Sequence, residues 1–276
     1  MKYKRSERLV YMTEYLTRRP NDLIPLTTFV NKFNQAKSSI SEDIRILKEV
    51  FESEGIGLVQ TTAGASGGVT FIPKITKTKA EEIVDHFIEE LSKKNRLLPG
   101  GYLYMSDLVG NTHVMDEISE LIVTMYENKE IDTVVTIATK GIPLAHAVAR
   151  KLNVPVAVIR KDNKITEGST VSVNYVSGST RKIETMILAK RTLENGARVL
   201  VVDDFLRAGG SINGVIRLME EFQAEVVGVS VLVESKDIID RVFTDYTSIA
   251  KVANIDEYNE TFDVEPGNCL EFFNKG

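Results

Sequence analysis

Two adjacent carboxylates stand at the end of an apolar run in the second half of the chain. Residues 199–202 are all aliphatic, Asp203 and Asp204 follow them, and residues 208–211 read Ala-Gly-Gly-Ser before a segment with helical periodicity. Consecutive glycines let a backbone wrap around a phosphate, and a helix N-terminus adds unpaired N–H groups and a favourable dipole. The hydroxyl of Ser211 can donate to the same phosphate.

The two acids of this loop require a different ligand group, because carboxylates repel a phosphate. We expect Asp203 and Asp204 to face the hydroxyls of a sugar, either directly or through a magnesium ion. An ordinary capped turn after a strand would explain the glycines, but it would not explain two consecutive acids after an aliphatic run. The loop therefore predicts a sugar-phosphate site.

A second anion-binding turn is predicted at residues 138–141, which read Ala-Thr-Lys-Gly between an apolar strand at 133–137 and a helix that begins near Pro143. Thr139 offers a hydroxyl, Lys140 offers a positive charge, and the glycine permits an unusual backbone. Any strand-to-helix turn can have this composition, so the prediction depends on the paired acids of the first loop.

The elements that must position both loops alternate between strands and helices. After a short polar linker at 74–79, apolar strands are expected at 133–137, 154–159, 198–202 and 225–233, and helices at 143–152 and 212–222. This alternation predicts the α/β class, with a parallel sheet, helices on both faces and ligands at the carboxyl ends of the strands. We therefore place a ligand-binding domain at residues 74–276.

The beginning of the chain has a different character. The first 40 residues carry eight Lys and Arg side chains against three Asp and Glu, although the whole chain has a net charge of −5. Segregation of this kind favours a module that faces a polyanion.

Apolar residues recur at helical spacing in three segments of this region. They are Leu9, Met12 and Leu16; Phe29 and Phe33; and Ile40, Ile44, Leu47 and Phe51. We expect the third helix to begin at Ser39, because Ser39 and Glu42 have the spacing of a capping box. Small hydroxyl and basic side chains lie on its other side, at Lys37, Ser38, Ser41 and Arg45. This is the arrangement of a helix-turn-helix whose last helix enters the major groove of DNA.

A β-hairpin is expected next, with strands at 58–62 and 69–72 and a glycine-rich turn between them. A hairpin in this position is a wing, and the backbone near Gly64, Ser66 and Gly67 can approach phosphates closely. Residues 1–73 are therefore predicted to form a winged helix-turn-helix domain. A three-helix adaptor with a solvent-exposed hairpin stays the alternative. RNA binding is less favoured, because RNA readers present aromatic side chains on sheets and the pattern contains no such platform.

Composition restricts the compartment and the class of protein. Hydrophobic residues make up 43% of the 276 residues and charged residues 26%, which is typical of globular proteins. No apolar run approaches the roughly 18 residues that a membrane helix needs, and no export signal is recognised at the start. The chain has one cysteine, Cys269, so no internal disulfide can form. We expect a cytoplasmic protein in which Cys269 is a packing thiol.

Residues 199–212, Val-Leu-Val-Val-Asp-Asp-Phe-Leu-Arg-Ala-Gly-Gly-Ser-Ile, resemble the signature of type I phosphoribosyltransferases. Together with the winged-helix pattern, and with residues 97–102, 158–170 and 175–184, they make the chain similar to the bacterial purine operon repressors over nearly its whole length. The resemblance implies a homodimeric repressor of purine biosynthesis and salvage genes that binds inverted operator sites in double-stranded DNA. Phosphoribosyl diphosphate (PRPP) would be the effector that relieves repression, and purine hyperphosphates such as guanosine tetraphosphate would compete with it.

The resemblance also assigns roles to individual positions. The effector is expected to contact Tyr102, Ala138, Thr139, Lys140, Gly141, Asp203, Asp204, Phe205, Ala208, Gly209, Gly210 and Ser211. DNA is expected to contact Lys2, Arg5, Arg8, Lys37, Ser38, Ser39, Ser41, Arg45, Gly64, Ser66 and Gly67. No catalytic residue, no cofactor and no metal site made by the protein alone is expected, although PRPP could bring Mg²⁺ with it. Residues 160–181 would correspond to the mobile flap of the enzymes.

The resemblance leaves two classes of function open. Ala208 stands where the enzymes usually carry threonine, and the missing hydrogen bond to a charged group is worth about 1.5–3 kcal/mol. That loss weakens a site without abolishing it. We therefore expect a phosphoribosyltransferase fold that is used for sensing, with a catalytically active purine phosphoribosyltransferase carrying a regulatory N-terminal domain as the alternative.

Overall fold

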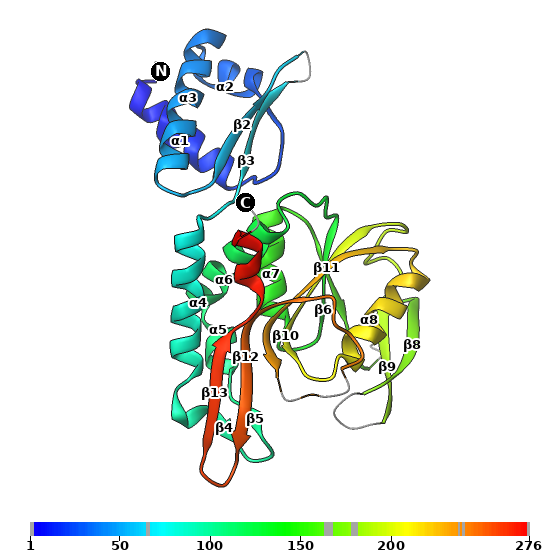
Figure 1. Cartoon of the computed structure of the whole chain (residues 1–276). Coiled ribbons are helices and arrows are strands. Elements are labelled where there is room, and N and C mark those ends of the chain that lie inside the picture. The colour runs from blue at the N-terminus through cyan, green and yellow to red at the C-terminus, as the bar shows by residue number, and fades with distance from the viewer. Residues whose placement is uncertain are drawn as a thin grey trace. The chain divides into compact units, whose positions relative to one another are not determined.

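The computed structural model describes residues 3–64, 67–162, 168–177, 182–236, 238 and 241–274. The chain forms two compact units (Figure 1). The first comprises Met1–Thr76 with Lys151–Asn153, and the second comprises Lys77–Arg150 with Val154–Gly276.

The first unit contains three helices and a small antiparallel sheet. Its elements are α1 (Arg5–Thr17), β1 (Ile24–Pro25), α2 (Leu26–Phe33), α3 (Lys37–Ser53), β2 (Leu58–Thr62) and β3 (Gly68–Ile72), and the strand order is β1-β3-β2. The helical spacing found in the sequence is confirmed, because all nine apolar residues that define it except Leu9 are buried in one core, against which Leu9 packs.

The start of α3 differs from the prediction. Asn34 ends α2 in the left-handed conformation with φ of 50°, and Ala36 is already extended, so the helical amides begin at Lys37. Ser39 is therefore the third residue of α3, and the predicted capping box of Ser39 and Glu42 is wrong. The reason is that the turn between α2 and α3 is shorter than a cap at Ser39 requires.

The second unit is built on a six-stranded sheet. Its elements are α4 (Lys77–Leu91), β4 (Leu97–Leu98), β5 (Tyr102–Leu103), α5 (Ser106–Gly110), α6 (Thr112–Met125), β6 (Thr133–Ile137), α7 (Ile142–Leu152), β7 (Val156–Ile159), β8 (Thr170–Val176), β9 (Ile183–Ala189), β10 (Arg198–Leu206), α8 (Gly210–Glu221), β11 (Glu225–Ser235), β12 (Thr247–Asp256) and β13 (Thr261–Pro266), with short 3-10 turns at Lys94–Arg96 and Cys269–Asn274.

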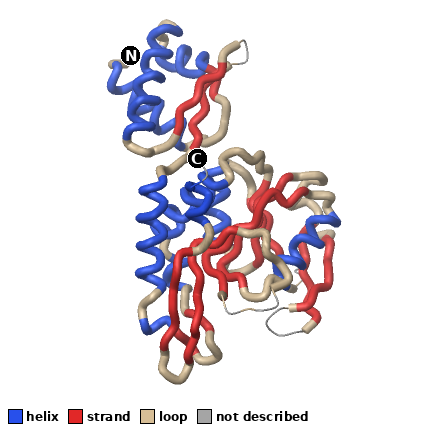
Figure 2. The backbone as a smooth tube through the Cα atoms, viewed as in Figure 1, coloured by secondary structure: helices blue, strands red, loops and turns tan. Residues whose placement is uncertain are grey.

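The large sheet has the order β13-β12-β11-β10-β6-β7, and only the edge strand β13 is antiparallel. Alternate strand residues such as Val135, Val199 and Val229 pack in one core with Ile212 of α8. The residues between them, such as Leu200, are also buried, so both faces are covered. Figure 2 shows α4 and α6 on one side of the sheet and α8 with the β8–β9 hairpin on the other. The predicted fold class is confirmed.

Strand and helix ends near the first loop differ from the prediction. β10 continues to Leu206, because its pairing with β11 extends as far as Leu206 and Glu234, so Asp203 and Asp204 lie inside the strand. The following helix begins at Gly210 and not at residue 212. The whole phosphate loop, which we define as residues 207–211, is therefore a short connection of three residues plus the first turn of a helix.

Two further properties of the chain are visible at this level. Cys269 is fully buried, and burial raises the pKa of its thiol to about 12, as a packing residue requires. Among the described residues, no helix is both long and apolar enough to span a membrane.

Candidate effector pocket and nucleic-acid interface

The phosphate loop joins the end of β10 to the start of α8, and its shape requires glycine. Gly209 has φ of 83°, a left-handed conformation that disfavours a side chain, and a Cβ atom there would lie 3.0 Å from Cβ of Phe243. Gly210 and Ser211 are the first residues of α8, so their N–H groups lack partners within the helix. This geometry leaves backbone donors at the helix N-terminus for an anion.

A pocket of about 320 Å³ opens above this loop. Nine of the twelve predicted effector residues line it, namely Tyr102, Lys140, Asp203, Asp204, Phe205, Ala208, Gly209, Gly210 and Ser211. Ala138, Thr139 and Gly141 are not among its lining residues. The structure therefore brings the two predicted loops to one site through Lys140, and it adds Tyr102, which is 60% exposed, from β5.

The two carboxylates both line this pocket, Asp203 as a buried side chain and Asp204 as a partly buried one. Burial, followed by the charge of Asp204, raises the pKa of Asp203 well above that of an ordinary aspartate. Burial also raises the pKa of Asp204, while its hydrogen bond with Asp203 and the charge of Lys140 oppose that shift. Asp203 Oδ1 accepts the N–H of Asp204 at 3.0 Å. Both carboxylates are thus placed to accept hydrogen bonds from a ligand that carries hydroxyl groups.

Gly141 explains how the second loop comes so close to β10. A Cβ atom at this position would lie 2.2 Å from Oγ1 of Thr136 and 2.7 Å from Oδ1 of Asp203, so only glycine fits. The Thr136 hydroxyl is buried and has no hydrogen-bond partner among the described residues. Ala138 is held by its N–H, which donates to the carbonyl of Ile159 at 2.8 Å, and its peptide bond to Thr139 is cis. Ala138, Thr139 and Gly141 therefore shape the turn that carries Lys140.

Sequence reasoning missed several lining residues, and the reasons differ. Arg207 lies within the recognised motif, and its charge was a signal in the sequence that could have identified it as a lining residue. Leu103, Met105 and Ile255 come from β5, the turn after it and β12. They had no local signal, because only the tertiary fold brings them to the pocket.

The predicted flap is partly described. Residues 168–177 and 182–189 contain the antiparallel strands β8 and β9, while residues 163–167 and 178–181 lie outside the described residues. Tyr175 of this hairpin packs on α8, since a Cβ atom at Gly214 would lie 2.8 Å from Cγ of the tyrosine. The Tyr175 hydroxyl donates to Glu184 at 2.7 Å, and Lys161 donates to the same carboxylate at 2.6 Å. The Lys161 charge and the Tyr175 hydroxyl keep the pKa of Glu184 low.

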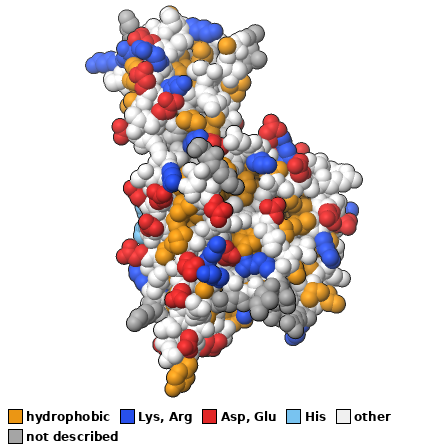
Figure 3. All heavy atoms as spheres, in the orientation of Figure 1, with side chains coloured by type: hydrophobic (Ala, Val, Ile, Leu, Met, Phe, Trp, Pro, Cys, Tyr) orange, Lys and Arg blue, Asp and Glu red, His pale blue; other side chains and the backbone are white. Residues whose placement is uncertain are grey.

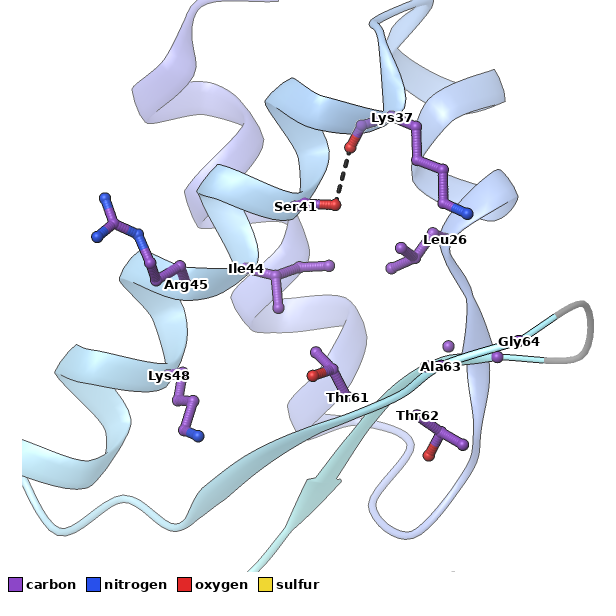
Figure 4. A pocket seen from close by; sticks show the side chains of 12 residues that line it. Leu26, Lys37, Ser41, Ile44, Arg45, Lys48, Thr61, Thr62, Ala63 and Gly64 are labelled. Atoms are coloured by element: carbon purple, nitrogen blue, oxygen red, sulfur yellow. Dashed lines mark hydrogen bonds between the residues drawn. The ribbon is translucent and has the colours of Figure 1, made fainter.

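The first unit has a groove of about 460 Å³ between α3 and the hairpin of β2 and β3 (Figure 4). It is lined by Leu26, Lys37, Ser41, Ile44, Arg45, Lys48, Thr61, Thr62, Ala63, Gly64, Gly67 and Gly68. Five predicted DNA contacts are among them: Lys37, Ser41, Arg45, Gly64 and Gly67. Lys48, Thr61 and Thr62 were missed, although Lys48 continues the helical spacing of Ser41 and Arg45.

Cations of this groove are largely free to meet a polyanion. The Arg45 side chain is 67% exposed, and its guanidinium nitrogen lies 3.8 Å from the Glu49 carboxylate. The Lys48 ammonium lies 4.0 Å from the Glu52 carboxylate. At these distances both pairs are weak surface contacts. Ser41 donates its hydroxyl to the carbonyl of Lys37 at 3.0 Å. In Figure 3, Lys and Arg side chains gather over the helices of the first unit.

The assignment of Arg8 to DNA needs correction. Its side chain is only 10% exposed, and its Nε lies 2.7 Å from Oδ2 of Asp43, which is fully buried. Arg5 binds the same carboxylate at 3.1 Å and Glu42 at 3.0 Å. Both arginines tie α1 to α3, so Arg8 is not available to a phosphate and Arg5 is engaged with acids.

Two further predicted DNA contacts, Ser38 and Ser39, are described but do not line the groove. Ser38 is exposed on α3 and Ser39 is partly buried. Lys2 and Ser66 lie outside the described residues.

Comparison with known proteins connects both sites to one family. The family described as bacterial purine repressor, N-terminal, matches residues 4–73, and the phosphoribosyl transferase domain family matches residues 106–265. The chain is 49% identical to the purine biosynthesis transcriptional repressor PurR of Bacillus subtilis (strain 168), over 99% of this chain and 96% of the relative. It is 46% identical to the purine biosynthesis transcriptional activator PurR of Lactococcus lactis subsp. lactis (strain IL1403), over 97% of this chain and 98% of the relative.

A solved structure supports the fold of the second unit. Adenine phosphoribosyltransferase from Thermoanaerobacter pseudethanolicus matches with a TM-score of 0.53 and 20% identity, over 61% of this chain and 99% of that one. The resemblance inferred from the sequence is confirmed by the full-length relatives. The chain belongs to the family of bacterial purine repressors, in which the repressor N-terminal domain is joined to a phosphoribosyl transferase domain.

Proposed function

We propose that this protein is a DNA-binding repressor of purine biosynthesis and salvage genes that releases its operators when PRPP occupies the pocket of the second unit. The observation that carries the proposal is the presence, in one chain, of a cationic groove beside α3 and a pocket with paired carboxylates above a helix N-terminus. A protein with both features can read the concentration of a sugar phosphate and report it to DNA.

The groove supports the DNA half of the proposal. Lys37, Arg45 and Lys48 can neutralise phosphates of one strand, while exposed side chains of α3 reach base edges in the major groove. Inverted operator sites would bind a homodimer, with one α3 helix in each half-site. The 49% identical relative named as a repressor favours repression as the direction of control.

The pocket supports PRPP as the effector. Its 5′-phosphate would take the amides of residues 209–211, its ribose hydroxyls would donate to Asp203 and Asp204, and its diphosphate would lie near Lys140. Among the described residues there is no group of three potential ligands for a metal ion. Magnesium would therefore arrive bound to the diphosphate. Guanosine tetraphosphate would compete, because it carries a ribose and phosphates that need the same donors.

A catalytically active phosphoribosyltransferase is the second candidate. The match of residues 106–265 to the phosphoribosyl transferase domain favours it. Ala208 favours sensing instead, because it removes one hydroxyl from the phosphate loop. Incubation of the protein with PRPP, Mg²⁺ and each purine base separates the two, since only an enzyme releases diphosphate in proportion to the base supplied.

The decisive experiment is an anisotropy titration of fluorescently labelled DNA taken from upstream of the purine genes, with unrelated DNA of equal length as reference. PRPP with Mg²⁺ is expected to weaken specific binding at least tenfold in the natural protein. Asp204→Asn should lose the response and keep DNA affinity, whereas Asp85→Asn, at an exposed position on α4, should behave like the natural protein. Equal DNA affinity with and without PRPP would overturn the proposal.

The direction of control is tested by deletion of the gene. Deletion should raise the expression of the purine genes, and a fall in their expression would show that the protein is an activator.

A further inference from the structure

A buried ion pair between Glu234 and Arg241 lies in the second unit, next to Ser235 of the pocket lining. Glu234, at the end of β11, has a side chain that is 7% exposed, and Arg241 pairs with its Oε2 while being 11% exposed. A second guanidinium nitrogen of Arg241 donates to the carbonyl of Ser235. The Tyr246 hydroxyl donates to Glu234 as well, and Ser248 donates to its Oε1 at 2.7 Å. The carboxylate thus accepts hydrogen bonds from Arg241, Tyr246 and Ser248, and the Lys251 ammonium lies 3.9 Å from its Oε1.

This arrangement fixes the connection between β11 and β12, of which we call residues 241–246 the bracing segment. The Arg241 guanidinium lies 5.2 Å from the ring centroid of Tyr246. Asn268 in turn donates from Nδ2 to the carbonyl of Tyr246 at 2.8 Å. Both ends of the bracing segment are therefore anchored to the sheet.

The middle of the bracing segment contacts the phosphate loop directly. The N–H of Val242 donates to the carbonyl of Ala208 at 3.0 Å. Phe243 lies against Gly209 so closely that a Cβ atom on the glycine would be 3.0 Å from Cβ and 3.1 Å from N of the phenylalanine. These contacts fall on Gly209, the N-cap of α8, and on Ala208 before it, the two positions that aim the free amides of the helix.

We propose that Arg241 is a positioning residue for the phosphate loop: its ion pair with Glu234 holds the bracing segment so that Val242 and Phe243 fix Ala208 and Gly209 in the conformation that receives a phosphate. Pre-ordering of this kind raises affinity because the ligand no longer has to order the loop when it binds. Arginine suits the role, since its planar group reaches Glu234 and Ser235 together, while the single ammonium of a lysine cannot.

The first test needs no effector, so its outcome does not depend on the proposed function. Hydrogen exchange of the backbone amides at residues 206–211 is measured in the natural protein, in Arg241→Gln and in Lys236→Gln. Lys236 is the matched control, because it lies in the same connection but pairs with Glu265 at an exposed site, 2.9 Å away. Exchange should become faster only in Arg241→Gln, and equal exchange in all three proteins overturns the inference.

The second test measures PRPP binding by calorimetry together with operator binding of the effector-free protein. Arg241→Gln should bind PRPP about tenfold more weakly and keep its operator affinity, and its melting temperature should fall because Glu234 loses a buried partner. Arg241→Lys should fall between this variant and the natural protein. Unchanged PRPP affinity overturns the inference. If the natural protein binds no PRPP while the exchange difference is present, the positioning role stands and only the proposed effector fails.

Replacing one partner of a buried pair can prevent folding, so a second variant probes the same step. Val242 is 60% exposed, and Val242→Pro removes the N–H that holds Ala208 while neither member of the ion pair is replaced. We expect faster exchange at residues 206–211 and weaker PRPP binding here too. A Val242→Pro protein that matches the natural one in both measurements overturns the inference.

Discussion

The carboxyl group of Asp203 lies in an environment that disfavours its ionised form. It is buried beside a second acid, and its hydrogen bond from the Asp204 amide only partly compensates for the lost water. Because its folded pKa is raised above its value in the unfolded chain, the group contributes stability below the unfolded pKa near 3.8 and loses that contribution as pH rises through the folded pKa. As pH rises from the unfolded pKa towards the folded pKa, this group therefore lowers the stability of the free protein.

Asp203→Asn should consequently be more stable than the natural protein and bind PRPP more weakly. A gain of about 1 kcal/mol would raise the melting temperature by roughly 2–4 °C for a domain of this size. The difference should grow as pH rises from 3.8 towards the folded pKa of Asp203, since only the natural protein has a carboxyl group whose ionisation the fold disfavours. Calorimetric melting over that pH range measures it, with Asp85→Asn as the control. A less stable Asp203→Asn at pH 8 would contradict this account of the site.

Arg8 and Arg45 illustrate two uses of the same side chain. Arg8→Ala leaves the Asp43 carboxylate buried with only the partner Arg5, and the loss of a buried partner costs about 3–5 kcal/mol. We expect the first unit of this variant to melt at a much lower temperature. Arg45→Ala should keep the melting temperature and lose DNA affinity. Circular dichroism melts with anisotropy titrations distinguish them, and an Arg8→Ala protein of normal stability but weak DNA binding would restore Arg8 as a DNA contact.

At the scale of elements, α3 was recognisable from the helical spacing of its apolar residues, and the hairpin after it was recognisable from two short apolar segments with a glycine-rich turn between them. Ile40, Ile44, Leu47 and Phe51 repeat with the helical period, and residues 58–62 and 69–72 are separated by glycines. The start of α3 was not predictable from Ser39, since a capping residue acts only if the preceding turn ends there. The burial of Arg8 was hidden as well, because its partner Asp43 lies 35 residues away in the sequence.

The pocket shows the same division between local and long-range information. Asp203, Gly209 and Ser211 belong to one motif, so the sequence could predict their proximity. Ile255 of β12 reaches the pocket only through the strand order of the sheet, which no local pattern specifies. The bracing segment was invisible for this reason too, as its residues have no motif of their own.

Lys48 allows a test of the groove as an element. If the groove holds a DNA strand, Lys48→Gln should weaken binding to specific and unrelated DNA alike and lower the slope of log affinity against log salt by about 1. Lys32→Gln, on α2 and with its ammonium 5.0 Å from the Tyr11 ring, is the matched control because Lys32 does not line the groove. Titrations at four salt concentrations give the slope. Equal slopes for the two variants would remove Lys48 from the interface.

At the scale of the whole molecule, the proposed function couples the binding of PRPP to the binding of operator DNA. PRPP can weaken DNA binding only if DNA weakens PRPP binding by the same factor, whatever route connects the two units. We therefore expect the ratio of operator affinities measured with and without PRPP to equal the ratio of PRPP affinities measured with and without saturating operator. Calorimetry and anisotropy provide the four constants. Two ratios of one would show that PRPP and the operator bind independently.

The burial of Cys269 makes it possible to label the protein at one chosen position and to follow operator binding by fluorescence. The only thiol of the chain is enclosed, and its pKa of about 12 leaves almost no thiolate at neutral pH. A maleimide dye added to the native protein should therefore find no target. A single cysteine introduced at Thr62, beside the groove, would then be labelled alone in an otherwise natural background, and its fluorescence could follow operator capture and release in real time.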